Sequence, residues 1–114
     1  MSKDAEIKFT IKLDQAKVPE QILWEASDSD FEGKKPCDSI MISICDKEAK
    51  NTLTIDLLTD KMEIGEIDAH FYFTFMKMAE TYYKSTKNKE LSDMIAHFAQ
   101  DFATKIEENA ELEQ

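Results

Sequence analysis

Glycine and proline are rare in this sequence, with only two residues of each among 114. A chain this poor in both does not have the composition of a disordered or collagen-like protein. Its glycines, Gly33 and Gly65, are isolated, so there is no glycine-rich loop of the kind that binds phosphate groups. The length suits one hydrophobic core of modest size. We therefore expect a single domain over residues 1–114.

Basic residues are also scarce, with 14 lysines and arginines against 24 acidic residues and a net charge of −10. This charge repels phosphate backbones and anionic lipid headgroups. The most apolar stretch, residues 69–83, is too short to cross a bilayer and contains Lys77 and Glu80. The first residues contain no apolar segment typical of a secretory signal. The sequence predicts a cytoplasmic protein that binds no nucleic acid and does not insert into membranes.

Cysteine and histidine, which serve most often as nucleophiles, bases or metal ligands, number two each. Cys37 directly precedes, and Cys45 ends, a segment that we interpret as one strand, which separates them by about 26 Å and excludes a disulfide bond between them. Free thiols fit a reducing cytoplasm. No histidine is near either cysteine in sequence, and the motifs GxSxG, HExxH and CxxC are absent.

The two histidines, His70 and His97, each have acidic neighbours one turn or less away. We interpret both as side chains at solvent-exposed helix edges; the alternative is a two-histidine metal site where those edges meet. The stretch DSDFEG, residues 28–33, imitates a calcium-binding loop, but Ser39 occupies the twelfth position, where a bidentate glutamate is needed. The sequence therefore predicts no enzymatic activity, no metal and no cofactor.

Alternation of apolar and polar residues predicts four strands in the first half of the chain, at residues 6–13, 21–27, 38–45 and 52–58. The short connection DKEAKN makes the last two strands a hairpin. Strands joined without helices predict an antiparallel sheet with one polar face.

The second half changes to helical periodicity. Apolar residues follow helical spacing from Leu91 to Ile106, with Asn88 as the N-cap. The stretch 69–83 predicts an earlier helix with two adjacent apolar stripes and one narrow polar strip, formed by His70, Thr74, Lys77, Thr81 and Lys84. One sheet cannot cover so wide an apolar arc. The helix must also contact the second helix, a symmetry mate or another protein.

The fold class predicted is α+β, with a four-stranded antiparallel sheet followed by two helices packed on one face. The strands occupy residues 6–58, the helices residues 63–107, and an acidic tail that we expect to fray residues 108–114. The same element order occurs in the SecB-like export-chaperone fold, which is an analogy of fold and not of function.

Apolar residues outside the predicted core mark a candidate partner or dimer surface. On the first helix these are Tyr72, Met76 and Tyr83, and on the outward sheet face Leu23, Met41 and Leu58. Scattered exposed apolar residues are also normal on soluble proteins. We expect a homodimer, because closed symmetric pairs are the commonest oligomers.

Five segments resemble the gliding motility-associated GldC family of Bacteroidota over residues 6–106: EIKFTIKLD, VPEQILWEASDS, IMISICDKEAKNTLTIDLLTDKM, FTFMKMAETYYKST and MIAHFAQDFATKI. The resemblance implies a small soluble accessory protein of the gliding machinery, which is linked to type IX secretion, with gliding or secretion proteins as partners. It implies no catalytic residues. The alternative function is a small SecB-like chaperone or export-targeting factor that binds unfolded peptide.

Overall fold

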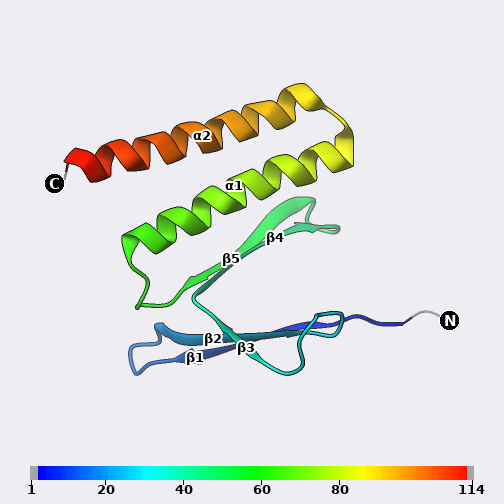
Figure 1. Ribbon diagram of the computed structural model, residues 1–114. Helices are drawn as coiled ribbons and strands as arrows, with labels where there is room; N and C mark the ends of the chain where they lie inside the picture. The colour runs from blue at the N-terminus through cyan, green and yellow to red at the C-terminus, as the bar shows by residue number, and fades with distance from the viewer. Residues whose placement is uncertain (1–2, 113–114) are drawn as a thin grey trace. The chain divides into compact units, whose positions relative to one another are not determined.

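A computed structural model describes residues 3–112 and has an α+β fold, which confirms the predicted class. The chain divides into two units, residues 1–62 and residues 63–114, and each is described here by itself. Within residues 3–112, the first unit contains five strands and the second two helices (Figure 1). In chain order these are β1 (Ile7–Leu13), β2 (Pro19–Ala26), β3 (Lys35–Cys37), β4 (Ser39–Asp46), β5 (Asn51–Leu58), α1 (Ile64–Thr86) and α2 (Lys89–Leu112).

The first three strands form an antiparallel sheet in the order β1-β2-β3. The turn between β1 and β2 depends on Asp14, whose Oδ1 accepts hydrogen bonds from the amides of Ala16 and Val18 at 2.8 and 3.0 Å. Lys17 takes the left-handed conformation that this turn requires, with φ of 65°. In the central strand Ile22 is fully buried, opposite Ile11 of β1.

Strands β4 and β5 form a separate two-stranded hairpin. Its register places one apolar row opposite another, with pairs Ile40–Leu57, Ile42–Ile55 and Ile44–Leu53 on one face. At the turn, Asp46 Oδ2 accepts a hydrogen bond from the amide of Ala49 at 2.6 Å. The predicted hairpin is therefore confirmed.

The prediction of one four-stranded sheet is wrong, because the strands form sheets of three and two. The sequence analysis missed β3, a three-residue strand within the segment interpreted as a polar loop and the start of the next strand. A strand of three residues is too short to show alternation. It also contains Pro36, which has no N–H to donate and is tolerated because β3 lies at the edge of the sheet. The predicted second strand also begins earlier, at Pro19, opposite the register shift at Leu13.

Caps define the helical unit. Glu63 forms a capping box with Glu66 at the start of α1, and Lys87 ends α1 in the left-handed conformation with φ of 61°. The predicted N-cap of α2 is confirmed, since Asn88 Oδ1 accepts a hydrogen bond from the Leu91 amide at 3.1 Å. Helix α2 continues to Leu112, beyond the predicted end near residue 107, while residues 113–114 of the predicted tail lie outside the described residues.

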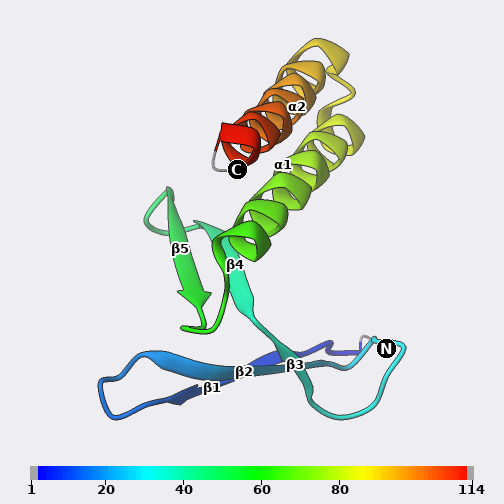
Figure 2. The same ribbon diagram turned by 60° about the vertical axis from the view of Figure 1, so that its left-hand side comes forward.

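The two helices lie antiparallel and side by side in both views (Figures 1 and 2). Small residues allow a close approach near the turn, where Ser92 Oγ of α2 donates to the carbonyl of Ala79 in α1 at 2.8 Å. Further along, Phe75 of α1 packs edge-on against Phe98 and Phe102 of α2, with ring centroids 5.2 and 5.3 Å apart. Aromatic packing therefore joins the two helices along this part of their length.

Candidate functional site

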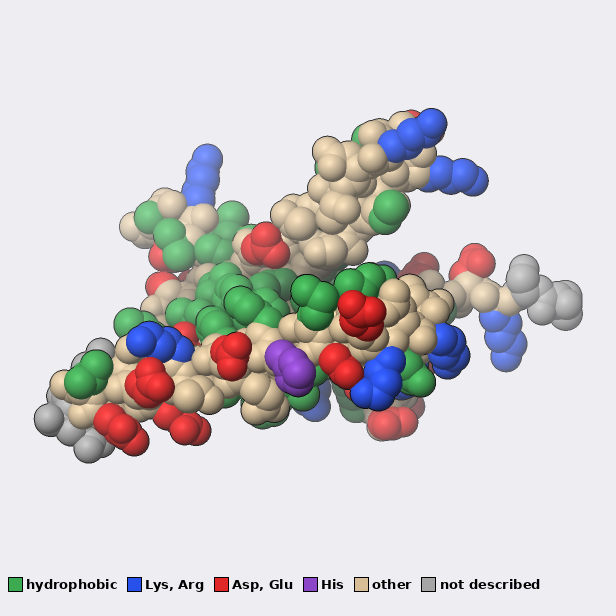
Figure 3. All heavy atoms as spheres, turned by 90° about the horizontal axis from the view of Figure 1, so that it is seen from above, with side chains coloured by type: hydrophobic (Ala, Val, Ile, Leu, Met, Phe, Trp, Pro, Cys, Tyr) green, Lys and Arg blue, Asp and Glu red, His purple; other side chains and the backbone are tan. Residues whose placement is uncertain are grey.

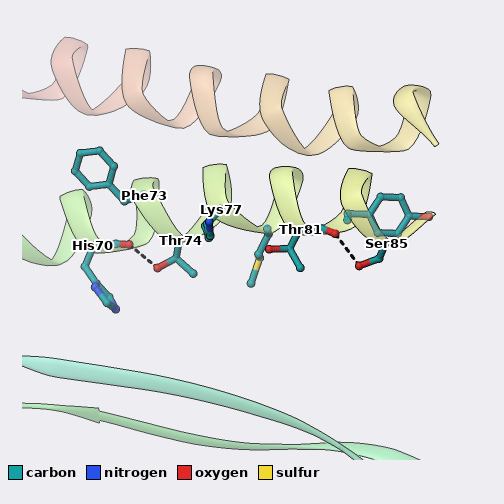
Figure 4. Close-up of a pocket in the computed structure, with 8 residues that line it drawn as sticks. His70, Phe73, Thr74, Lys77, Thr81 and Ser85 are labelled. Carbon is teal, nitrogen blue, oxygen red and sulfur yellow. Dashed lines mark hydrogen bonds between the residues drawn. The ribbon is translucent and has the colours of Figure 1, made fainter. Parts of the chain in front are cut away.

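A hollow on the helical unit lies along α1, and its lining residues all belong to that helix (Figure 4). Its volume is about 680 Å³ and it is wide open. We call this surface the α1 hollow; its lining residues are His70, Phe73, Thr74, Lys77, Met78, Thr81, Tyr82 and Ser85. Helical spacing brings them together, because residues three, four and seven apart share a face.

Two of the four hydroxyl groups in the α1 hollow already form hydrogen bonds within the helix. Thr74 Oγ1 donates to the carbonyl of His70 at 2.7 Å, and Ser85 Oγ donates to the carbonyl of Thr81 at 2.8 Å, as the dashed lines in Figure 4 show. These side chains therefore present mainly methyl or methylene groups outward. The α1 hollow is therefore more apolar than its residue types indicate. For this reason the polar strip predicted for this helix lines a largely apolar surface.

The imidazole of His70 is the polar exception. Its Nε2 is buried and has no hydrogen-bond partner among the described residues. A buried polar atom without a partner costs free energy. The interpretation of His70 as a solvent-edge side chain is therefore wrong for this nitrogen, whereas His97 is exposed as predicted.

Two large apolar side chains of the α1 hollow face solvent. Phe73 is 68% exposed and Met78 is 51% exposed. Isolated exposed apolar residues are unremarkable, but both of these line the α1 hollow, with Phe73 at the edge nearer α2 (Figure 4). The sequence analysis did not select Phe73, because neither apolar stripe of the predicted helix included it. The sequence did contain one indication of its exposure: Phe73 directly precedes Thr74, a residue of the predicted polar strip.

The structure divides the predicted helix residues. Tyr72 and Met76 are half-buried, and the hydroxyl of Tyr72 lies 3.3 Å from Nε2 of Gln100, which donates to it. Tyr72 thus belongs to the contact between α1 and α2. Tyr83 is 43% exposed, with Lys87 Nζ 5.5 Å from its ring centroid. Of these three residues, Tyr83 is the most available to a partner.

The predicted sheet residues fall on two different sheets. Leu23 lies in β2, between Thr10 of β1 and Pro36 of β3. Met41 and Leu58 lie diagonally across β4 and β5, on the face opposite the isoleucine row. All three are half-buried. The sheet pairing therefore brings Met41 and Leu58 together and does not place Leu23 beside them.

Other features of the described residues offer less chemistry. Acidic and basic side chains occupy the outer surface of α2 (Figure 3), where Lys89 and Asp93 form an ion pair of 2.8 Å. Within residues 3–112, no three His, Cys, Asp or Glu side chains are grouped so that they could hold a metal ion. Neither helix in that range has the length and apolar character needed to cross a membrane.

The two cysteines differ in environment. Cys37 is half-buried, and burial together with the negative charge of Asp38 raises the pKa of its thiol, while Cys45 is exposed. Because only the thiolate reacts with alkylating reagents, we expect Cys45 to be alkylated several-fold faster than Cys37 at pH 8. Timed iodoacetamide labelling read by peptide mass spectrometry measures both rates in one sample. Equal rates in the folded protein, with unfolded protein as the control, would contradict this expectation.

Comparison with known proteins identifies a family for most of the chain. The family model described as "Gliding motility-associated protein GldC-like" matches residues 19–108. No curated protein and no solved structure matches the chain.

Proposed function

Because the chain belongs to the GldC-like family of gliding motility-associated proteins, we propose that it is a non-catalytic accessory protein that acts by binding other proteins of the gliding or secretion machinery. The observation that carries this proposal is the α1 hollow, where Phe73 and Met78 are exposed beside hydroxyls bonded within the helix. A surface of this kind suits protein contact. We place the protein in the cytoplasm, as a homodimer, as part of the same proposal.

The chemistry of the α1 hollow supports a particular kind of partner. An amphipathic segment would place its apolar side chains against Phe73 and Met78, and His70 Nε2, which is buried, would not contribute to that contact. At the edge of the hollow, Lys77 is already paired with Glu80 at 3.3 Å. Attraction to acidic partners therefore contributes little, and the contact depends mainly on apolar burial.

We expect the double substitution Phe73→Asp/Met78→Asp to abolish capture of the partner, because it places two charges where an apolar surface must be desolvated. The measurement is gentle crosslinking in native cytosol followed by pull-down and mass spectrometry. The matched control is Met94→Asp, since Met94 is also apolar and 62% exposed but lies on α2 outside the hollow. Circular dichroism of each variant establishes that it is folded.

Each outcome separates one function from another. A dominant motility or secretion protein captured by wild type and by Met94→Asp, and lost in the double variant, supports the accessory function and its surface. The same protein captured equally by all three forms would show that the α1 hollow is not the surface. Capture of many unrelated unfolded proteins would instead favour the chaperone function, which suppression of aggregation of an unrelated unfolded protein tests directly.

A further inference from the structure

The outer edge of β1 carries backbone groups that no other strand uses. β1 is the first strand in the order β1-β2-β3, so β2 pairs with only one of its edges. The amide of Ser27 donates to the carbonyl of Glu6 at 3.0 Å, which directs the backbone of Glu6 toward the partner strand. Alternation along an antiparallel ladder then points the N–H and C=O groups of Ile7, Phe9 and Ile11 outward. Within residues 3–112 these groups have no backbone partner.

The side chains of the same residues form an apolar row on one face of the sheet. Ile7 is 69% exposed, Phe9 37% and Leu13 53%. Proteins commonly protect such an edge with a proline, a bulge, a very short strand or lysine side chains, because an open edge pairs with other strands, and of these β1 has Lys8 and Lys12. β1 is seven residues long, contains no proline and has its only irregularity at the last residue. Another strand with the same alternation can form hydrogen bonds with these backbone groups and can pack against the apolar row. A second copy of β1 is such a strand.

The charges of β1 distinguish between the registers open to two antiparallel copies. With the two-fold axis at Phe9, Glu6 lies opposite Lys12 of the other copy, twice by symmetry, and Lys8 lies opposite Thr10. With the axis at Thr10, Lys8 instead lies opposite Lys12, which places like charges in direct contact. These even-numbered residues would occupy the non-hydrogen-bonded pairs, where side chains approach most closely.

A register with the axis at Ile11 also avoids contact between lysines, because it sets Lys8 opposite Asp14. That register pairs a shorter length of strand, since Ile7 would then face Gln15 in the turn. It also leaves Lys12 opposite Thr10, without a countercharge. Within its own sheet Lys12 faces Gln21, and among the described residues it forms no ion pair. The axis at Phe9 is the one that gives Lys12 an acidic partner along the full strand.

We propose that two copies of this chain pair along their β1 edges, antiparallel and with Phe9 on the two-fold axis, into one continuous sheet of order β3-β2-β1-β1-β2-β3. The pairing adds backbone hydrogen bonds at Ile7, Phe9 and Ile11 and joins the two apolar rows on one face. The inference rests on the homodimer included in the proposed function, and it assigns that dimer to a surface distinct from the α1 hollow.

Single cysteines locate the axis. In a background of Cys37→Ser/Cys45→Ser, Phe9→Cys places two cysteines about 5.5 Å apart across the axis, within disulfide reach. Ile11→Cys places them roughly 14 Å apart, which is beyond reach. We expect mild oxidation to link Phe9→Cys into covalent dimers and to leave Ile11→Cys and Thr10→Cys unlinked. Efficient linkage at Ile11 or Thr10, or none at Phe9, would overturn the register.

Charge exchange tests the same register without a crosslink. We expect Lys12→Glu to raise the dimer dissociation constant about tenfold, because two attractive pairs become repulsive. Glu6→Lys/Lys12→Glu should return it to within about threefold of wild type, and Lys8→Gln should change it less than about threefold, since Lys8 faces Thr10 and its 3.5 Å ion pair with Glu6 is exposed. Sensitivity at Lys8 instead of Lys12 would place the axis at Ile11.

Light scattering by the wild-type protein separates the two proposals. A dimer that Phe9→Cys does not link, and that Lys12→Glu does not weaken, would overturn β1 pairing and leave the homodimer standing. A strict monomer at micromolar concentration would refute the homodimer together with β1 pairing. The accessory function would then still depend on the pull-down with the α1 hollow variants.

Discussion

Replacing Ile22 with alanine should lower the free energy of unfolding of the strand unit by about 3 kcal/mol. Ile22 is the largest side chain that is fully buried, and it lies in the central strand between Ile11 and Cys37. The substitution removes buried apolar atoms and leaves a cavity that the neighbouring strands can close only in part. The expected loss is a large fraction of the stability of a small domain.

Urea unfolding followed by the fluorescence of Trp24 measures this loss, because Trp24 is the only tryptophan and lies in the same strand. Its ring contacts that of Phe31 edge-on at 4.9 Å, so separation of the two should change the emission. The control is Ile55→Ala, the same chemical change in β5, away from the β1 edge, at a side chain that is 48% exposed. Equal shifts of the urea midpoint for the two variants would mean that Ile22 does not anchor this sheet.

Replacing Phe75 with alanine should destabilise the helical unit by about 3 kcal/mol, at the low end of the range for phenylalanine because the side chain is half-buried. Phe75 contacts three other rings, those of Phe71, Phe98 and Phe102. Among residues 3–112, no other side chain joins both helices through so many aromatic contacts. The substitution therefore removes packing from α1 and α2 at the same time.

Far-UV circular dichroism during urea unfolding measures this change, since the helices dominate the signal. Phe73→Ala is the matched control: it removes the same atoms two residues away, where the side chain is 68% exposed, and should cost less than about 1 kcal/mol. In the pull-down the order of the two variants should be reversed. Phe73→Ala should lose capture of the partner protein, whereas Phe75→Ala, if folded, should retain it. A Phe73→Ala variant as unstable as Phe75→Ala would place Phe73 in the core.

The regular elements could be predicted from the sequence because their signals are local. Period-two alternation indicated four strands, helical spacing indicated α2, and the cap at Asn88 was readable because one residue type at one position performs that role. The pairing of strands was not readable in the same way. The separation of β4 and β5 from the other strands depends on which backbone edges meet, and β3 is too short to show a period.

The candidate site was harder to predict, for a physical reason that Thr74 and Ser85 illustrate. Their residue types count as polar in any periodicity analysis, yet each hydroxyl bonds a carbonyl of its own helix and leaves an apolar outer surface. Tyr72 shows the reverse: the sequence marked it as available, and the structure gives its hydroxyl a donor in Gln100. A pattern of polar and apolar residue types shows which polar atoms a side chain has, but it does not show which of these atoms already form hydrogen bonds within the protein.

The strand pairings have a kinetic consequence. Within residues 3–112 each pairing joins strands adjacent in the chain, β1 with β2, β2 with β3 and β4 with β5, and the two helices form a hairpin closed by Lys87 and Asn88. Closing such short loops costs little conformational entropy, and folding rates rise as contacts become more local. The chain should therefore fold rapidly for a protein with five strands, with each hairpin forming as soon as its own segment has been synthesised.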